Sequence, residues 1–159
     1  MESGTSRGSF YHYFEAKDAL LGSLSYLFDD KYQELVPELE KIDSCYERLL
    51  FLNQELFGMI ENSVAIELLA RLLSSQLITK GEKHLLDRNR YYYKLLRKIC
   101  LEGQECGELT KEMTVNELVK VYAIAERALM YDWCICNGEY SLKSYAAMTM
   151  PFFLKRMLA

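Results

Sequence analysis

Apolar residues recur every three or four positions along most of the chain, which is the period of an α-helix with one buried face. The clearest case is the segment 17–36. Its inward-facing positions are Leu20, Leu24, Leu27, Phe28, Tyr32 and Leu35. Pro37 follows, and because proline removes a backbone donor, we expect the helix to kink or stop there. No alternating pattern of useful length indicates a strand, so the sequence predicts an all-α protein.

The same period and the usual capping residues predict five further helices. Their expected ranges are 43–61, 63–77, 82–105, 114–137 and 141–158, with a loop at 79–82 around Gly81. Asp43 is the expected cap of the first of these. Thr114 and Glu117 have the spacing of a capping box, and Gly138 is placed to end the 114–137 helix in a left-handed conformation.

The last two predicted helices carry more apolar surface than one small domain can bury. The 114–137 helix is apolar on nearly every side, and such a helix must be covered on every side. We therefore expect a symmetric homodimer that meets through a four-helix interface. The expected interface residues are Leu118, Tyr122, Leu129, Trp133, Tyr145, Met148 and Phe152.

Composition agrees with a globular helical chain of 159 residues, of which 50% are hydrophobic and 26% charged, with only two prolines. The net charge of −4 argues against binding of polyanions by the whole surface, so any DNA affinity has to come from local placement of charge. No run reaches the ~20 apolar residues of a membrane span, and no signal peptide is present. The sequence thus predicts a cytoplasmic protein without membrane contact.

Five cysteines, an odd number, indicate reduced thiols rather than a disulfide framework. Cys134 and Cys136 lie two apart on a predicted helix and point in different directions, which opposes chelation. Cys100 and Cys106 flank a turn without a nearby histidine. We therefore expect no metal site and no cofactor.

Residues 4–18 combine small polar, basic and aromatic side chains just before the 17–36 helix. Phe10 and Phe14 are four apart and face inward together, and Ser6 can cap the segment. The polar residues left outward are Arg7, Ser9, Tyr11 and His12, with Lys17 at the start of the next helix. A surface of this kind is suited to a charged partner.

This segment resembles the recognition helix and following turn of TetR-type (tetracycline-repressor-like) transcriptional regulators. The residues that carry the resemblance are Gly8, Phe10, Tyr11, Tyr13, Phe14 and Lys17. The run Gly-Gln-Glu-Cys-Gly-Glu at 103–108 is similar to a turn found before the last two helices of many members. With the predicted helices, the resemblance to this family covers almost the whole chain.

The resemblance implies three regions: 1–16 as a remnant of a helix-turn-helix, 17–36 as a connecting helix, and 37–159 as a ligand-binding and dimerisation domain. The residues it implies for DNA contact are Ser6, Arg7, Ser9, Tyr11, His12 and Lys17. Two helices of the DNA-binding unit have no counterpart ahead of Gly4, so we expect a regulator truncated at its amino end that binds DNA poorly in this form.

The implied function is a ligand-responsive repressor that binds operator DNA as a homodimer and is controlled by a small-molecule effector. The alternative is a helical dimerisation or interaction module without DNA binding. An enzyme is not expected, because His12 and His84 are far apart and no catalytic triad or phosphate-binding glycine loop is visible.

Glu126 and Arg127 interrupt the apolar 114–137 helix, and this makes them candidates for an effector pocket. The other candidate wall residues are Phe57, Met59, Tyr92, Tyr122 and Trp133. The alternative is that these aromatic residues are ordinary core packing and that Glu126 and Arg127 pair with other charges or lie at the rim of the dimer.

Overall fold

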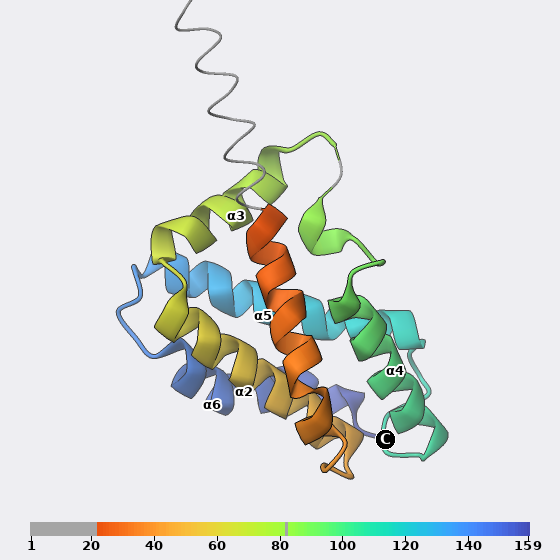
Figure 1. Cartoon of the computed structure of the whole chain (residues 1–159). Helices are drawn as coiled ribbons and strands as arrows, with labels where there is room; N and C mark the ends of the chain where they lie inside the picture. The colour runs from red at the N-terminus through yellow and green to blue at the C-terminus, as the bar shows by residue number, and fades with distance from the viewer. Residues whose placement is uncertain (1–21, 82) are drawn as a thin grey trace, which may run out of the picture.

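A computed structural model describes residues 22–81 and 83–159, and this part of the chain is all-α, as the sequence predicts (Figure 1). Its first helix covers residues 22–39. The helices that follow are α2 (Cys45–Ser63), α3 (Ile66–Ile78), α4 (Tyr91–Glu105), α5 (Val115–Ile135) and α6 (Leu142–Leu154). Two single 3-10 turns, η1 (His84–Leu86) and η2 (Lys155–Met157), precede α4 and follow α6.

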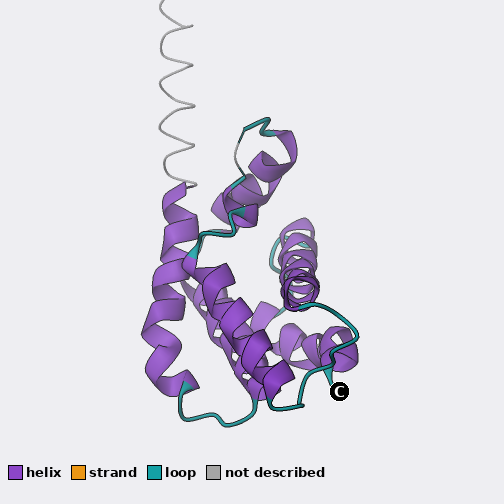
Figure 2. Cartoon of the chain, turned by 90° about the vertical axis from the view of Figure 1, so that its right-hand side faces the viewer, coloured by secondary structure: helices purple, strands orange, loops and turns teal. Residues whose placement is uncertain are grey.

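The core lies where these helices face one another. α2 packs against α4 and α6, and α5 packs against α3, α4 and α6. Figure 2 shows that helices form every layer of the described chain and that loops join them at the ends. Leucines and aromatic residues from all of the helices make one continuous apolar cluster. None of the described helices combines the length and the apolar composition that a bilayer span requires.

Several helix ends follow the local signals in the sequence. Thr114 accepts a hydrogen bond from the backbone N–H of Glu117, and the Glu117 side chain bonds back to the Thr114 N–H, which completes the predicted capping box. At the other end of α5, Asn137 and Gly138 have φ values of 53° and 71°. This left-handed pair ends the helix where the sequence predicts.

The start of α2 differs from the prediction, because Ser44 and not Asp43 is its cap. The end of the first helix differs too, since it continues past Pro37 to residue 39. Proline is tolerated there because only a short final turn follows it, after which the backbone N–H of Glu40 bonds to the Val36 carbonyl oxygen.

The predicted 82–105 helix is too long: α4 begins at Tyr91, and η1 and a turn occupy the preceding residues. Asn89 donates its backbone N–H to the Asp87 side chain at 2.9 Å, which forms a local turn in competition with the helix. Arg90 then enters the core and pairs with Asp29. A long-range ion pair thus decides where α4 starts.

The 103–109 segment ends α4 and holds the start of α2. The Gly103 carbonyl oxygen accepts hydrogen bonds from the backbone N–H groups of Glu108 and Leu109, both at 2.9 Å. Gly107 makes this turn possible, because its φ of 80° suits glycine. The turn then delivers the Glu108 carboxylate to α2, where it accepts from the backbone N–H groups of Cys45 and Tyr46 at 2.7 and 3.1 Å.

Gly103 has no room for a side chain, so we expect Gly103→Ala to destabilise the protein. A Cβ at this position would lie 2.5 Å from Leu109 Cδ1, and Leu109 is itself buried. Overpacking of this kind costs about 1–3 kcal/mol, against the small gain that alanine usually brings to a helix. Urea unfolding measures the difference. Gly81→Ala is the control, because no atom of the described residues lies within 4 Å of its added Cβ. Equal stability of the two variants would contradict the packing argument.

Candidate functional site

The most unusual side chain in the described core is Glu126 of α5, which is only 1% exposed. It lies one helical turn after Tyr122 and one turn before Met130, on the buried stripe of its helix. Burial of an isolated carboxylate destabilises the fold unless hydrogen-bond donors or cations contact it or it takes up a proton. Its surroundings therefore decide what this position can do.

Two helices bring neutral polar groups to the Glu126 carboxylate. The Tyr92 hydroxyl of α4 donates to Oε1 at 2.6 Å, and the Asn53 amide of α2 donates to Oε2 at 2.9 Å. Burial raises the pKa of Glu126 to about 7, although these hydrogen bonds and the nearby Arg127 charge act in the opposite direction. The carboxyl group thus changes charge near neutral pH.

Two buried polar atoms of this cluster have no hydrogen-bond partner among the described residues: the Tyr32 hydroxyl and Asn53 Oδ1. Tyr32 comes from the first helix and its ring meets that of Tyr92 edge to face, with centroids 5.2 Å apart. The neighbouring Tyr122 hydroxyl donates to the Leu49 carbonyl oxygen at 3.0 Å. Burial raises the pKa values of Tyr32, Tyr92 and Tyr122 well above the usual range, so these phenols stay neutral.

A small cavity of about 30 Å³ opens beside this cluster, and we call it the Glu126 cavity. That volume holds about one water molecule. Its polar walls are Tyr32, Arg90, Tyr92, Tyr93, Glu126 and Arg127, and its apolar walls are Phe28, Leu56, Leu85, Ala123 and Met130. Phe28 and Tyr32 come from the first helix, so this helix forms part of the cavity wall.

A much larger apolar groove of about 530 Å³, the outer groove, lies between α3, η1 and α5. Leu73, Leu77, Leu86, Ile124 and Tyr131 are among its walls. Leu85 and Arg127 border both the outer groove and the Glu126 cavity, and Arg127 also borders a third hollow of about 240 Å³. Arg127 Nη1 is 3.4 Å from the Tyr93 hydroxyl oxygen, in a weak contact across this boundary. The Arg127 side chain therefore separates the buried carboxylate from the hollows outside.

An ion pair fixes one side of the cavity. Arg90 donates from Nε and Nη2 to the two carboxylate oxygens of Asp29, at 3.0 and 2.9 Å. The two side chains are 7% and 8% exposed. Asp29 Oδ1 also accepts the Tyr92 backbone N–H at 3.2 Å. Through this pair the first helix is attached to the start of α4, next to Tyr92.

The residues that the sequence suggested for a pocket divide into two groups. Tyr92, Glu126 and Arg127 do border the Glu126 cavity, and Tyr122 lies beside them. Phe57, Met59 and Trp133 do not line it; Phe57 is fully buried core, and Trp133 Nε1 donates to the Tyr140 carbonyl oxygen at 2.9 Å. For these last residues the structure favours the alternative of ordinary packing.

Sequence reasoning missed Tyr32, Asn53 and Arg90. Asn53 gave a usable signal, because it occupies the buried stripe of α2 between Leu49 and Phe57, at spacings of four. Tyr32 gave no such signal, since tyrosine is common on a half-apolar helix face. Arg90 gave none either, because it stands among several other charged residues of the 82–105 segment.

The expected interface residues fall into a buried group and an exposed group. Leu118, Tyr122, Leu129 and Trp133 are buried inside the single chain, so they are core residues and are not available to a partner. Tyr145, Met148 and Phe152 of α6 are 43%, 57% and 80% exposed. On α5 the exposed apolar positions are instead Ile124, Tyr131 and Ile135.

The residues suggested for DNA contact, Ser6, Arg7, Ser9, Tyr11, His12 and Lys17, lie outside the described residues. Comparison with family models, with curated proteins and with solved structures finds no match to this chain.

Proposed function

We propose that the chain is a ligand-responsive, DNA-binding transcriptional regulator, and that the Glu126 cavity receives its effector. The observation that carries this proposal is a buried carboxylate whose hydrogen-bond donors are neutral groups, beside a cavity and two polar atoms that have no partner among the described residues. Such an arrangement lowers the stability of a core, so a role in binding accounts for it better than packing does.

Asn53 Oδ1 has unused capacity to accept a hydrogen bond among the described residues. Of the two cations that border the cavity, Arg90 is already paired with Asp29, which leaves Arg127 as the cation nearest the buried carboxylate. Glu126 and Asn53 Oδ1 are acceptors, and the Tyr92 ring already attracts one cation, because the Arg90 guanidinium carbon lies 5.7 Å from its centroid. We therefore propose an amphiphilic organic cation as the effector. Its charged head enters the Glu126 cavity after Arg127 moves aside, and its apolar body lies in the outer groove.

The route from effector to DNA runs through the first helix. Phe28 and Tyr32 of this helix line the cavity, and the segment with the recognition-helix resemblance, residues 4–18, precedes it in the chain. A ligand that enlarges the cavity displaces Tyr32 and thereby shifts the helix. In a dimer, that shift changes the separation of two recognition helices, which has to match successive major grooves.

Selection of duplexes from a randomised DNA library tests this function, with the protein expressed together with the two helices that the resemblance places ahead of residue 4. We expect enrichment of a palindromic site whose half-site centres lie about 34 to 36 Å apart or a multiple of this, and release of the DNA by organic cations. Arg7→Ala is expected to abolish the enrichment. Selection that enriches no sequence would contradict DNA recognition and favour the alternative, a helical dimerisation module.

The exposed apolar stripe on α6, formed by Tyr145, Met148 and Phe152, supports a homodimer under either function. We expect wild-type protein to sediment as a dimer and Phe152→Glu as a monomer, because Phe152 is 80% exposed on this stripe and a buried carboxylate there opposes association. Ile78→Glu on α3 is the matched control, since Ile78 is 79% exposed and lies off the stripe. Sedimentation velocity reports all three; a monomeric wild type, or equal behaviour of the two variants, would remove the proposed interface.

A further inference from the structure

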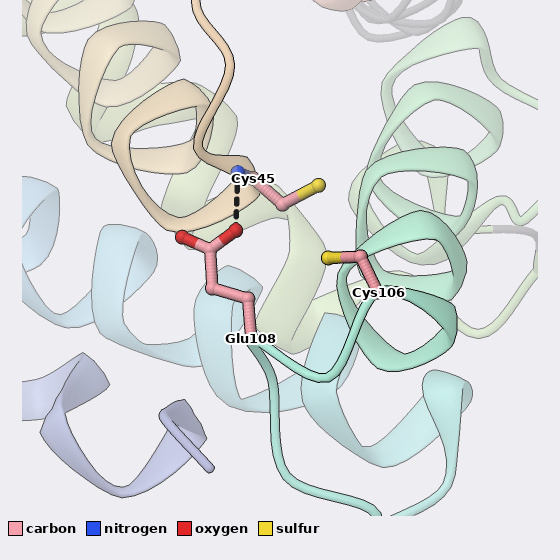
Figure 3. A group of neighbouring side chains, drawn as sticks. All are labelled: Cys45, Cys106 and Glu108. Carbon is pink, nitrogen blue, oxygen red and sulfur yellow. Dashed lines mark hydrogen bonds between the residues drawn. The ribbon is translucent and has the colours of Figure 1, made fainter.

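Two cysteines that are 61 positions apart in the sequence lie next to each other in the fold, together with a carboxylate. Cys45 is the first residue of α2, Cys106 is the cap at the end of α4, and Glu108 follows in the turn. The two sulfur atoms and a Glu108 carboxylate oxygen all lie within 4.8 Å of one another. Figure 3 shows the two sulfur atoms near each other between α2 and the end of α4, with the Glu108 carboxylate beside the Cys45 backbone.

Hydrogen bonds hold these groups in place before any ligand arrives. Glu108 accepts from the Ser44 hydroxyl and from the backbone N–H groups of Cys45 and Tyr46. The Cys106 thiol donates to the Gly103 carbonyl oxygen at 3.4 Å, which fixes its direction. Cys45 is buried and Cys106 is exposed, so the cluster is open to solvent on the Cys106 side.

We propose that Cys45, Cys106 and Glu108 bind one thiophilic divalent metal ion, such as Zn²⁺ or Cd²⁺. Two sulfur donors and one carboxylate select such ions over Mg²⁺ or Ca²⁺, which prefer oxygen ligands. Three ligands leave the fourth tetrahedral position to water, on the exposed side of Cys106. On binding, the two thiols release two protons to solvent and no electron is transferred.

The electrostatic surroundings fit the charge of the occupied site. Two thiolates, one carboxylate and a divalent ion leave a net charge of −1. That charge lies at the amino end of α2, where the helix dipole stabilises anions. The Arg48 guanidinium acts on both Cys45 and Glu108, although it is also paired with the Glu102 carboxylate at 2.9 Å, so part of its charge is already balanced.

Titration of the reduced full-length chain with Cd²⁺, followed by thiolate-to-metal charge-transfer absorbance and by competition with Zn²⁺, tests the proposal. We expect one ion per chain and a higher midpoint of thermal unfolding when it is bound. Cys106→Ser is expected to weaken binding at least tenfold while it keeps the helical circular dichroism, because Cys106 is exposed. Glu108→Gln should retain the absorbance of two thiolates but bind more weakly.

Cys136→Ser is the matched control, since Cys136 is a thiol at the end of a different helix and is not part of the cluster. It should bind Cd²⁺ as the wild type does. Equal titrations of Cys106→Ser and wild type would overturn the site. So would reduced wild-type protein that binds no ion.

Discussion

Glu126→Gln is expected to make the protein more stable at pH 8 and to change its stability little at pH 5. Burial raises the pKa of Glu126 from 4.5 to about 7, so the folded protein binds more protons than the unfolded chain between these two values. Stability from this group therefore falls as pH rises through that window and is constant above it. The difference between the two pKa values corresponds to about 3 kcal/mol.

A glutamine at position 126 removes the charge and keeps the shape. Its oxygen can accept from Tyr92, and its amide can donate to Asn53 Oδ1, which has no donor in the wild type. One of the two original hydrogen bonds is lost in this exchange, at about 1 kcal/mol. We thus expect a net gain of about 1–3 kcal/mol at pH 8.

Urea unfolding of wild type and variant at pH 5 and pH 8 measures the effect, and the change in their difference isolates residue 126. Glu40→Gln is the control, because Glu40 is exposed and its loss should leave the pH dependence unaltered. A Glu126→Gln protein less stable than wild type at pH 8 would mean that the ionised carboxylate is well accommodated. The buried charge would then not destabilise the core, and a cationic ligand would have no such destabilisation to remove.

Asp29→Ala is expected to destabilise the protein by about 3–5 kcal/mol. It leaves the Arg90 guanidinium buried without its bidentate partner and removes the acceptor of the Tyr92 backbone N–H. The variant should also loosen the first helix from α4. Unfolding by urea gives the loss of stability, and hydrogen exchange of the amides in 22–39 should rise.

The exposed pair Lys41–Glu38 provides the control for Asp29→Ala, because its side chains are 70% and 57% exposed. Glu38→Ala should cost less than about 1 kcal/mol. Replacement of both buried partners, Asp29→Leu with Arg90→Met, should cost less than Asp29→Ala alone, because no unpaired charge remains. Equal effects of Asp29→Ala and Glu38→Ala would show that the buried pair does not hold the first helix.

Local signals predicted the helices wherever neighbouring residues decide the outcome. The Thr114 capping box and the Gly138 stop are examples, since each depends on contacts within a few positions. The start of α4 could not be predicted, because Arg90 leaves the helix to pair with Asp29, 61 positions earlier. The same holds for α2, where Glu108 supports the cap from 64 positions away.

The candidate site was partly visible for the same reason. Glu126 and Asn53 are polar residues on apolar stripes, and such breaks in a pattern can be read without a structure. Tyr32 could not be found, because only the packing of the first helix against α4 gives its hydroxyl a buried position without a partner. The pairing of Cys45 with Cys106 was hidden as well, since each cysteine appears alone in its own segment.

Calorimetric titration with benzyltrimethylammonium, its longer-tailed homologues and a neutral isostere with carbon in place of nitrogen tests the effector site most directly. We expect the wild type to bind the cation more tightly than the isostere at pH 8, and to lose this preference as pH falls below about 7 and Glu126 takes up a proton. Glu126→Gln should have no such preference at either pH. Equal affinity of wild type and Glu126→Gln for the cation, or no binding by the wild type, would contradict the account.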